Sequence, residues 1–228
     1  DSADRWGISF NNDNNTLNFM YASGIMSVIL EDGKPVPNTY NDKMISFIDS
    51  MYDLIYNDNR TLFTDYNTQW DLGAGGFKDG RILLFCLTVG DMVSFRDAEI
   101  DIGMIPYPMW DENQDGYRTT SHNSVSMMCF PVTVKDPEMS AIITEALCAE
   151  SLYTLTPAYY DVTLKTKAAR DEESSAMLDI IFANRVFELG NFWAWGGIYD
   201  VPGAQSYAGK TDIVSAVEKK LPTVEKAM

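Results

Sequence analysis

The sequence predicts an α/β fold, and two observations support this prediction. Short apolar runs typical of buried strands alternate along the chain with longer amphipathic segments typical of helices. The hydrophobic fraction is 46% of 228 residues, which is enough for one large core or two small ones and too much for a disordered chain. A folded protein with strands and helices interleaved is therefore expected.

Two short apolar runs, residues 81–89 and residues 100–107, are each expected to form a buried strand. A third apolar run covers residues 125–134, where Pro131 indicates a sheet edge or the end of a strand. Residues 73–76, Gly-Ala-Gly-Gly, lack the following residues of a dinucleotide- or phosphate-binding loop, so we interpret them as a flexible turn.

Four helices are expected around these strands. Residues 40–57 carry apolar side chains at helical spacing with aspartates between them. Residues 136–137, Asp-Pro, provide an N-cap and an N1 proline for a second helix. A third helix follows Asp171, with Gly190 as its expected C-terminal glycine, and the last helix begins after Thr211 as its cap.

The charge balance argues against one class of partner. The chain has 17 Lys and Arg against 33 Asp and Glu, a formal net charge of −16, whereas nucleic-acid binding depends on cationic side chains that neutralise phosphates. No stretch approaches the roughly 18 apolar residues of a membrane span. Cys86, Cys129 and Cys148 stand far apart in apolar runs, so we interpret them as buried thiols.

Patterns for catalysis or metal binding are weak. His122 is the only histidine, and its polar surroundings favour a hydrogen-bonding role. Residues 111–116 resemble the first half of a calcium loop, but the twelfth position is His122 instead of glutamate, which favours an Asx turn. We expect no metal and no cofactor, and assign no catalytic residue. A carboxylate pair for glycoside hydrolysis has no identifiable position.

Two stretches combine polar and aromatic residues. Residues 106–123 form a long segment anchored by prolines, a length typical of functional loops or crossings between domains. Residues 190–209 are rich in glycine and aromatic residues. Exposed aromatic faces can stack on sugar rings, although each such residue can also pack a loop onto the core. The aromatic residues outside helical stripes are Trp70, Tyr107, Trp110, Tyr117, Tyr159, Tyr160, Trp193 and Trp195.

Residues 76–85, Gly-Phe-Lys-Asp-Gly-Arg-Ile-Leu-Leu-Phe, carry the pattern Phe-x-x-Gly-(Lys/Arg)-apolar. Further segments follow in a characteristic order, namely residues 95–97, 102–108, 111–117, 158–167, 170–181 and 211–215. As a set, they resemble the extracellular solute-binding proteins of ABC importers, family 1, the sugar-binding type. The resemblance implies a periplasmic-binding-protein-like type II fold, in which hinge crossings join two α/β lobes and the ligand lies between them.

The resemblance also implies a division of the chain. Residues 1–107 would form the first part of the C-terminal lobe, and residues 108–123 a hinge crossing. Residues 124–170 would belong to the N-terminal lobe, and residues 171–228 would cross back and add helices to the C-terminal lobe. Family members are about twice as long, and their front half carries a signal peptide, a lipid-attachment cysteine and most of the N-terminal lobe. This chain is expected to correspond to the C-terminal half.

The function implied by the resemblance is capture of a carbohydrate, such as an oligosaccharide, and its delivery to the membrane permease subunits of an ABC importer. The protein would be a non-catalytic monomer, and in full length a cell-surface lipoprotein. Two other hypotheses remain open at this point. One is a glycan-active hydrolase with an unlocated carboxylate pair, and the other is a non-catalytic surface scaffold module.

Matching positions to the family identifies eight candidate ligand-binding residues. Residues 11–19 match the first cleft loop, and Thr88 to Asp91 match a loop that often supplies a stacking tryptophan, which is absent here. The candidates are Asn15, Phe19, Asp91, Arg96, Tyr159, Tyr160, Trp193 and Trp195.

Overall fold

The computed structural model describes residues 3–12, 15–38, 41–122, 128–165 and 171–228. Helices make up 55% of the chain and strands 12%, in a mixed α/β arrangement with small parallel sheets. The α/β class expected from the sequence is therefore confirmed.

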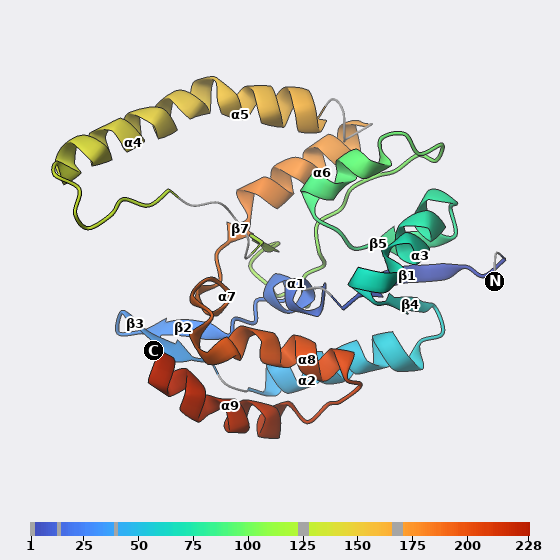
Figure 1. The fold of residues 1–228 in the computed structure, drawn as a ribbon. Coiled ribbons are helices and arrows are strands. Elements are labelled where there is room, and N and C mark those ends of the chain that lie inside the picture. Colours follow the sequence, from blue (N-terminus) through green and yellow to red (C-terminus); the bar gives the residue numbers. More distant parts are fainter. Residues whose placement is uncertain (1–2, 13–14, 39–40, 123–127, 166–170) are drawn as a thin grey trace.

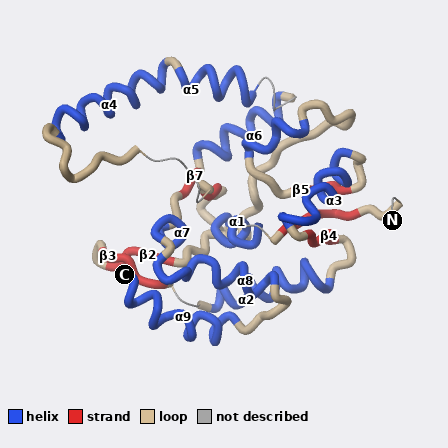
Figure 2. The backbone as a smooth tube through the Cα atoms, viewed as in Figure 1, coloured by secondary structure: helices blue, strands red, loops and turns tan. Residues whose placement is uncertain are grey.

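A three-stranded parallel sheet, in the order β4-β1-β5, lies beside the N-terminus, at the right in Figures 1 and 2. Its strands are β1 (Trp6–Asn11), β4 (Thr61–Thr64) and β5 (Ile82–Phe85), the last confirming the strand expected within residues 81–89. Phe10 of β1 pairs with Phe63, and Ser9 pairs with Phe85. Because all three strands are parallel, their carboxyl ends meet at one edge of the sheet.

The larger hydrophobic core covers one face of this sheet. Phe10 points into it, joined by the partly buried Phe63. Its helices are α1 (Asn15–Ala22), α2 (Asp42–Tyr52), which a π-helical turn η1 (Asp53–Asn57) extends, α8 (Val201–Tyr207) and α9 (Ile213–Ala227). The helix expected within residues 40–57 is thus confirmed.

The smaller core lies around Phe95, Leu164 and Leu178, which are almost completely buried. It is built from α3 (Tyr66–Lys78), the 3-10 helix η2 (Val89–Phe95), the π-helical η3 (Ala158–Lys165) and α6 (Glu172–Ala183). The predicted strand at residues 100–107 is wrong, because this segment has no strand partner; Ile102 and Met104 are nevertheless buried in the smaller core.

Residues 73–76 correct a second expectation, because they lie inside helix α3 and not in a turn. A Cβ on Gly73 would stand 3.0 Å from a ring atom of Phe85 and 3.2 Å from the Ser9 hydroxyl. A Cβ on Gly76 would stand 2.9 Å from Cδ1 of Ile82. These glycines let the helix approach the sheet closely.

The helix ends agree with the sequence at some positions and differ at others. Asp136 caps α4 (Pro137–Tyr153), and Asp171 caps α6, as predicted. The predicted role of Gly190 is wrong, because α6 ends at Ala183 and Gly190 lies in the short helix α7 (Leu189–Trp193). The last helix is capped by Asp212, one residue after the expected Thr211.

Two smaller pairings complete the sheet structure. Strands β2 (Val28–Glu31) and β3 (Lys34–Pro37) form an antiparallel hairpin. Strands β6 (Thr119–Thr120) and β7 (Arg185–Val186) pair in parallel, so the chain at the end of the 106–123 segment lies beside the chain that follows α6. The apolar run at 125–134 forms no strand in residues 128–134, and its first three residues lie outside the described part of the chain.

Helix α4 continues through α5 (Leu155–Pro157) into η3, and Figure 1 shows α4 and α5 arching away from the sheet. We call α4 and α5 the arm. No residue of α4 is buried. The arm also overturns part of the cysteine prediction, because Cys148 is exposed, as is Cys129 before it, and only Cys86 is a partly covered core thiol.

Candidate functional site

An open pocket of about 330 Å³ lies at the carboxyl edge of the parallel sheet. Residues that follow the strands line it: Asn11 ends β1, Tyr66 follows β4, and Cys86 to Thr88 follow β5. Ligands of open parallel sheets bind at this edge, because the loops that leave the strands diverge there. The pocket is the best candidate functional site in the described part of the chain.

Amide side chains form the floor of the pocket beside α1. Asn15 is buried, and its Oδ1 accepts a hydrogen bond of 2.8 Å from the backbone N–H of Asn11. This bond fixes the orientation of the amide and leaves the Asn15 NH2 group without a partner among the described residues. Asn18, one turn later, also lines the pocket. The floor therefore offers donors and acceptors suited to hydroxyl groups.

Two aromatic rings form a wall of the pocket. Tyr66 and Trp70 lie one turn apart on α3, with ring centroids 5.5 Å apart and an interplanar angle of 71°. Trp70 is braced from behind by Phe85 of β5, at a centroid distance of 5.5 Å. Asp65 caps the helix that carries both rings, and hydrogen bonds from Thr68 and then Asn12 lower the pKa of its carboxyl. The wall is thus held in place before any ligand arrives.

Asp91 supplies a carboxylate to the pocket from the first turn of η2. The Thr88 hydroxyl donates to Asp91 Oδ2 at 2.7 Å, and the Thr88 backbone N–H donates to the same oxygen at 3.2 Å. This reciprocal cap restricts the Asp91 side chain to one arrangement.

Cys86 and His122 also belong to the pocket lining. Burial raises the pKa of the Cys86 thiol to about 12, so this cysteine stays protonated at neutral pH and is a poor nucleophile. His122 is exposed at the rim of the pocket. The lining groups suit hydrogen bonding and ring stacking with a ligand.

Of the eight candidates from the sequence, Asn15 and Asp91 line this pocket. Phe19 lies nearby in the structure but is packed between other rings, 5.1 Å from Phe10 and 4.8 Å from Tyr107 between centroids. Arg96 lies outside the pocket lining and forms an exposed ion pair with Asp97 at 3.5 Å.

The other four candidates, which are aromatic, do not line the pocket. Tyr159 is exposed on η3, whereas the Tyr160 hydroxyl donates to Asp179 at 2.7 Å. Trp193 and Trp195 stack on each other at 6.1 Å and 18°, across the junction of α7 with the 3-10 helix η4 (Trp195–Asp200). Trp193 is 62% exposed, and Trp195 packs against the larger core.

Sequence reasoning missed Tyr66 as a pocket residue, included Asn18 only within the segment 11–19, and named Trp70 only as a member of the aromatic set. The missing information was the position of β4, a four-residue strand that the sequence analysis did not identify. Once β4 is placed, Tyr66 and Trp70 follow its carboxyl end, where pocket residues of a parallel sheet are expected.

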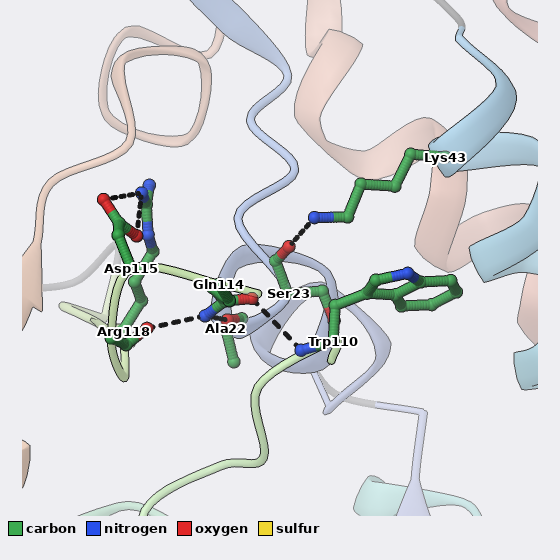
Figure 3. Close-up of polar contacts among 8 residues, drawn as sticks. Ala22, Ser23, Lys43, Trp110, Gln114, Asp115 and Arg118 are labelled. Atoms are coloured by element: carbon green, nitrogen blue, oxygen red, sulfur yellow. Dashed lines mark hydrogen bonds and ion pairs between the residues drawn. The ribbon is translucent and has the colours of Figure 1, made fainter. Parts of the chain in front are cut away.

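The segment at residues 106–123 is attached to the far end of the same helix α1 (Figure 3). The Gln114 side chain donates to the carbonyl oxygen of Ala22 at 2.9 Å and accepts from the Trp110 backbone N–H at 3.1 Å. Lys43 donates to the Ser23 carbonyl oxygen at 2.6 Å. Both bonds satisfy carbonyls at the end of α1. The Gln114 bond connects the segment to the helix that lines the pocket, and the Lys43 bond connects α2 to the same helix end.

The acidic stretch in this segment forms a turn. The Asn113 backbone N–H donates to Asp111 Oδ1 at 2.9 Å, which confirms the Asx turn. Among the described residues, no group of three or more acidic, histidine or cysteine side chains is arranged to hold a metal ion. None of the helices in the described ranges is long and apolar enough to span a membrane. No family model and no curated protein matches the chain.

Proposed function

We propose that this chain is part of an extracellular solute-binding protein that captures a carbohydrate and delivers it to the permease subunits of an ABC importer. The observation that carries the proposal is the open pocket at the carboxyl edge of the parallel sheet, where amides, a carboxylate and an aromatic wall converge. A sugar ring would stack on Trp70 and Tyr66, while Asn15 and Asp91 bind its hydroxyls. The protein binds and releases the sugar unchanged.

A second lobe completes the proposed type II fold. Apolar residues occupy almost every side of α4, yet Ile142, Ile143 and Leu147 are each more than half exposed. A helix that is apolar all round is normally enclosed by other elements. We propose that residues 124–170 belong to that second lobe.

The hydroxyl side chains of α4 are compatible with burial of the side of the helix that carries them. The hydroxyls of Ser140, Thr144 and Ser151 each donate to the backbone carbonyl four residues earlier, at 2.9, 2.8 and 2.7 Å. Their hydrogen-bonding needs are therefore met within the helix, so burying this side would leave these donors satisfied. This side of α4 can therefore be covered by another element of the proposed second lobe.

The proposed mechanism is closure of the two lobes around the sugar. The crossing at residues 108–123 would act as a hinge. Its attachment to α1 through Gln114 would hold one end of the hinge in a constant position relative to the pocket. The permease would recognise the closed form. A cell-surface lipoprotein that acts as a monomer, without catalysis, metal or cofactor, belongs to the same proposal.

Titration of the intrinsic tryptophan fluorescence with a panel of oligosaccharides tests this function. A saturable change is expected from a matching sugar, together with full recovery of the sugar after incubation. Trp70→Ala should abolish the change. Trp6→Ala, at the opposite end of β1, should leave it intact and is the matched control.

Two outcomes would contradict the proposed function, and a third would contradict the proposed site. Release of shorter sugars from the panel would indicate a hydrolase, and a flat response to every sugar would remove the carbohydrate function. A change that survives Trp70→Ala but disappears in Trp193→Ala would move the ligand site to the stacked pair Trp193 and Trp195.

A further inference from the structure

Asp91 has one carboxylate oxygen in use and one still available. Both hydrogen bonds from Thr88 end on Oδ2. Oδ1 accepts no hydrogen bond from the residues that the structure describes. Because the cap fixes the side chain of this pocket-lining residue, its second oxygen is an acceptor whose position is set before a ligand binds.

The charge of Asp91 makes this acceptor selective. An ionised carboxylate forms strong hydrogen bonds with hydroxyl and ammonium donors, and it repels a ligand carboxylate at the same distance. The net charge of −16 on the chain adds a longer-range repulsion of anions. The neighbouring rings of Tyr66 and Trp70 act in the same direction, because the face of an aromatic ring is electron-rich and attracts C–H groups and cations.

On the basis of the proposed carbohydrate function, we propose that the pocket selects neutral and amino sugars and rejects acidic sugars, with Asp91 as the residue that discriminates between them. The sugar presents hydroxyl or ammonium donors to Asp91 Oδ1 and a C–H face to the Tyr66 and Trp70 wall. A uronate in the same position places its carboxylate against Asp91. Asn15 contributes a neutral donor and does not offset that repulsion.

Isothermal titration calorimetry on the full chain tests this selectivity with three sets of oligosaccharides matched in length: neutral, amino-substituted and uronate. At low salt, the uronates should bind at least about tenfold more weakly than their neutral counterparts, and the amino sugars at least as tightly. The difference between uronates and neutral sugars should shrink when salt is raised, because salt screens the repulsion.

Asp91→Asn is the decisive variant. It keeps a side-chain acceptor, removes the charge, and should reduce the discrimination against uronates to less than about threefold. Asp97→Asn removes the same charge from an exposed side chain outside the pocket and should leave the discrimination unchanged.

The results separate failure of this inference from failure of the proposed function. Uronates that bind the wild-type chain as well as neutral sugars, or a discrimination that survives Asp91→Asn, would overturn the inference while sugar binding still stands. Binding of none of the three sets would overturn the carbohydrate function and this inference together.

Discussion

Helices α2 and α4 have the same kind of N-cap but differ in burial. Asn41 caps α2 by accepting from Met44 N–H, and Asp136 caps α4 by accepting from Met139 N–H, each at 2.9 Å. Helix α2 buries an apolar stripe in the larger core, including Ile48, whereas α4 buries no residue. The two helices show that local sequence decides where a helix forms, and that burial requires a partner surface supplied from elsewhere.

The largest expected difference between these helices is the effect of removing an isoleucine side chain. Ile48→Ala should lower the free energy of unfolding by about 2–5 kcal/mol, because Ile48 is 0% exposed and its loss leaves a cavity. Ile142→Ala removes the same atoms from a side chain that is 57% exposed, and should change stability by less than about 0.5 kcal/mol. Urea denaturation measures both. A large loss in Ile142→Ala would mean that the arm packs against the chain.

A smaller loss of stability is expected where the start of α7 contacts the β2–β3 hairpin. Glu188 is buried, and one of its oxygens accepts from Ser27 N–H at 3.0 Å, Ser27 Oγ at 2.8 Å and Val28 N–H at 2.9 Å. Its other oxygen accepts from Asn191 N–H. Glu188→Gln replaces one carboxylate oxygen by an NH2 group, which then faces an N–H or O–H donor instead of accepting from it. The change should lower the free energy of unfolding by about 1–3 kcal/mol.

Glu173→Gln is the control for this change, because Glu173 is an exposed carboxylate on α6. It should alter stability by less than about 0.5 kcal/mol. Equal effects in the two variants, measured by thermal unfolding, would show that Glu188 does not anchor α7 to the hairpin.

The smallest difference is expected at the helix caps. Asn41→Ala should lower the global stability by about 0.5–2 kcal/mol, because α2 is part of the larger core. Asp136→Ala weakens the first turn of α4 by a similar local amount, but should leave the global unfolding transition unchanged. Amide hydrogen exchange detects the local effect as faster exchange in the first turn of α4. A lowered global transition in Asp136→Ala would contradict the separation between the arm and the main body.

Much of the fold could be predicted because it depends on local patterns. The helix start at Asp136, the amphipathic stripe of α2 and the apolar run of β5 are all properties of short stretches of sequence. The errors have a common physical cause. Gly73 and Gly76 allow a helix to approach a strand closely, and a contact between distant segments cannot be distinguished from a turn by composition alone.

The candidate site shows the same limit. Asn15 and Asp91 were identified individually, but their meeting in one pocket depends on β1 and β5 being neighbours in the sheet. Tyr66 was missed because β4, which places it, is only four residues long. Trp193 and Trp70 both lie in stretches with aromatic residues, so the sequence does not distinguish them. Only the structure shows that Trp70 lines the pocket and that Trp193 does not.

The sequence by itself determined the α/β class, the acidic surface charge and the starts of the helices, because propensity, periodicity and capping act within a few residues. The tertiary structure decided which strands are neighbours, which aromatic residues line the pocket and which apolar helix remains uncovered. These properties depend on contacts between residues far apart in the chain, and such contacts form only when the sheet order β4-β1-β5 brings their elements together.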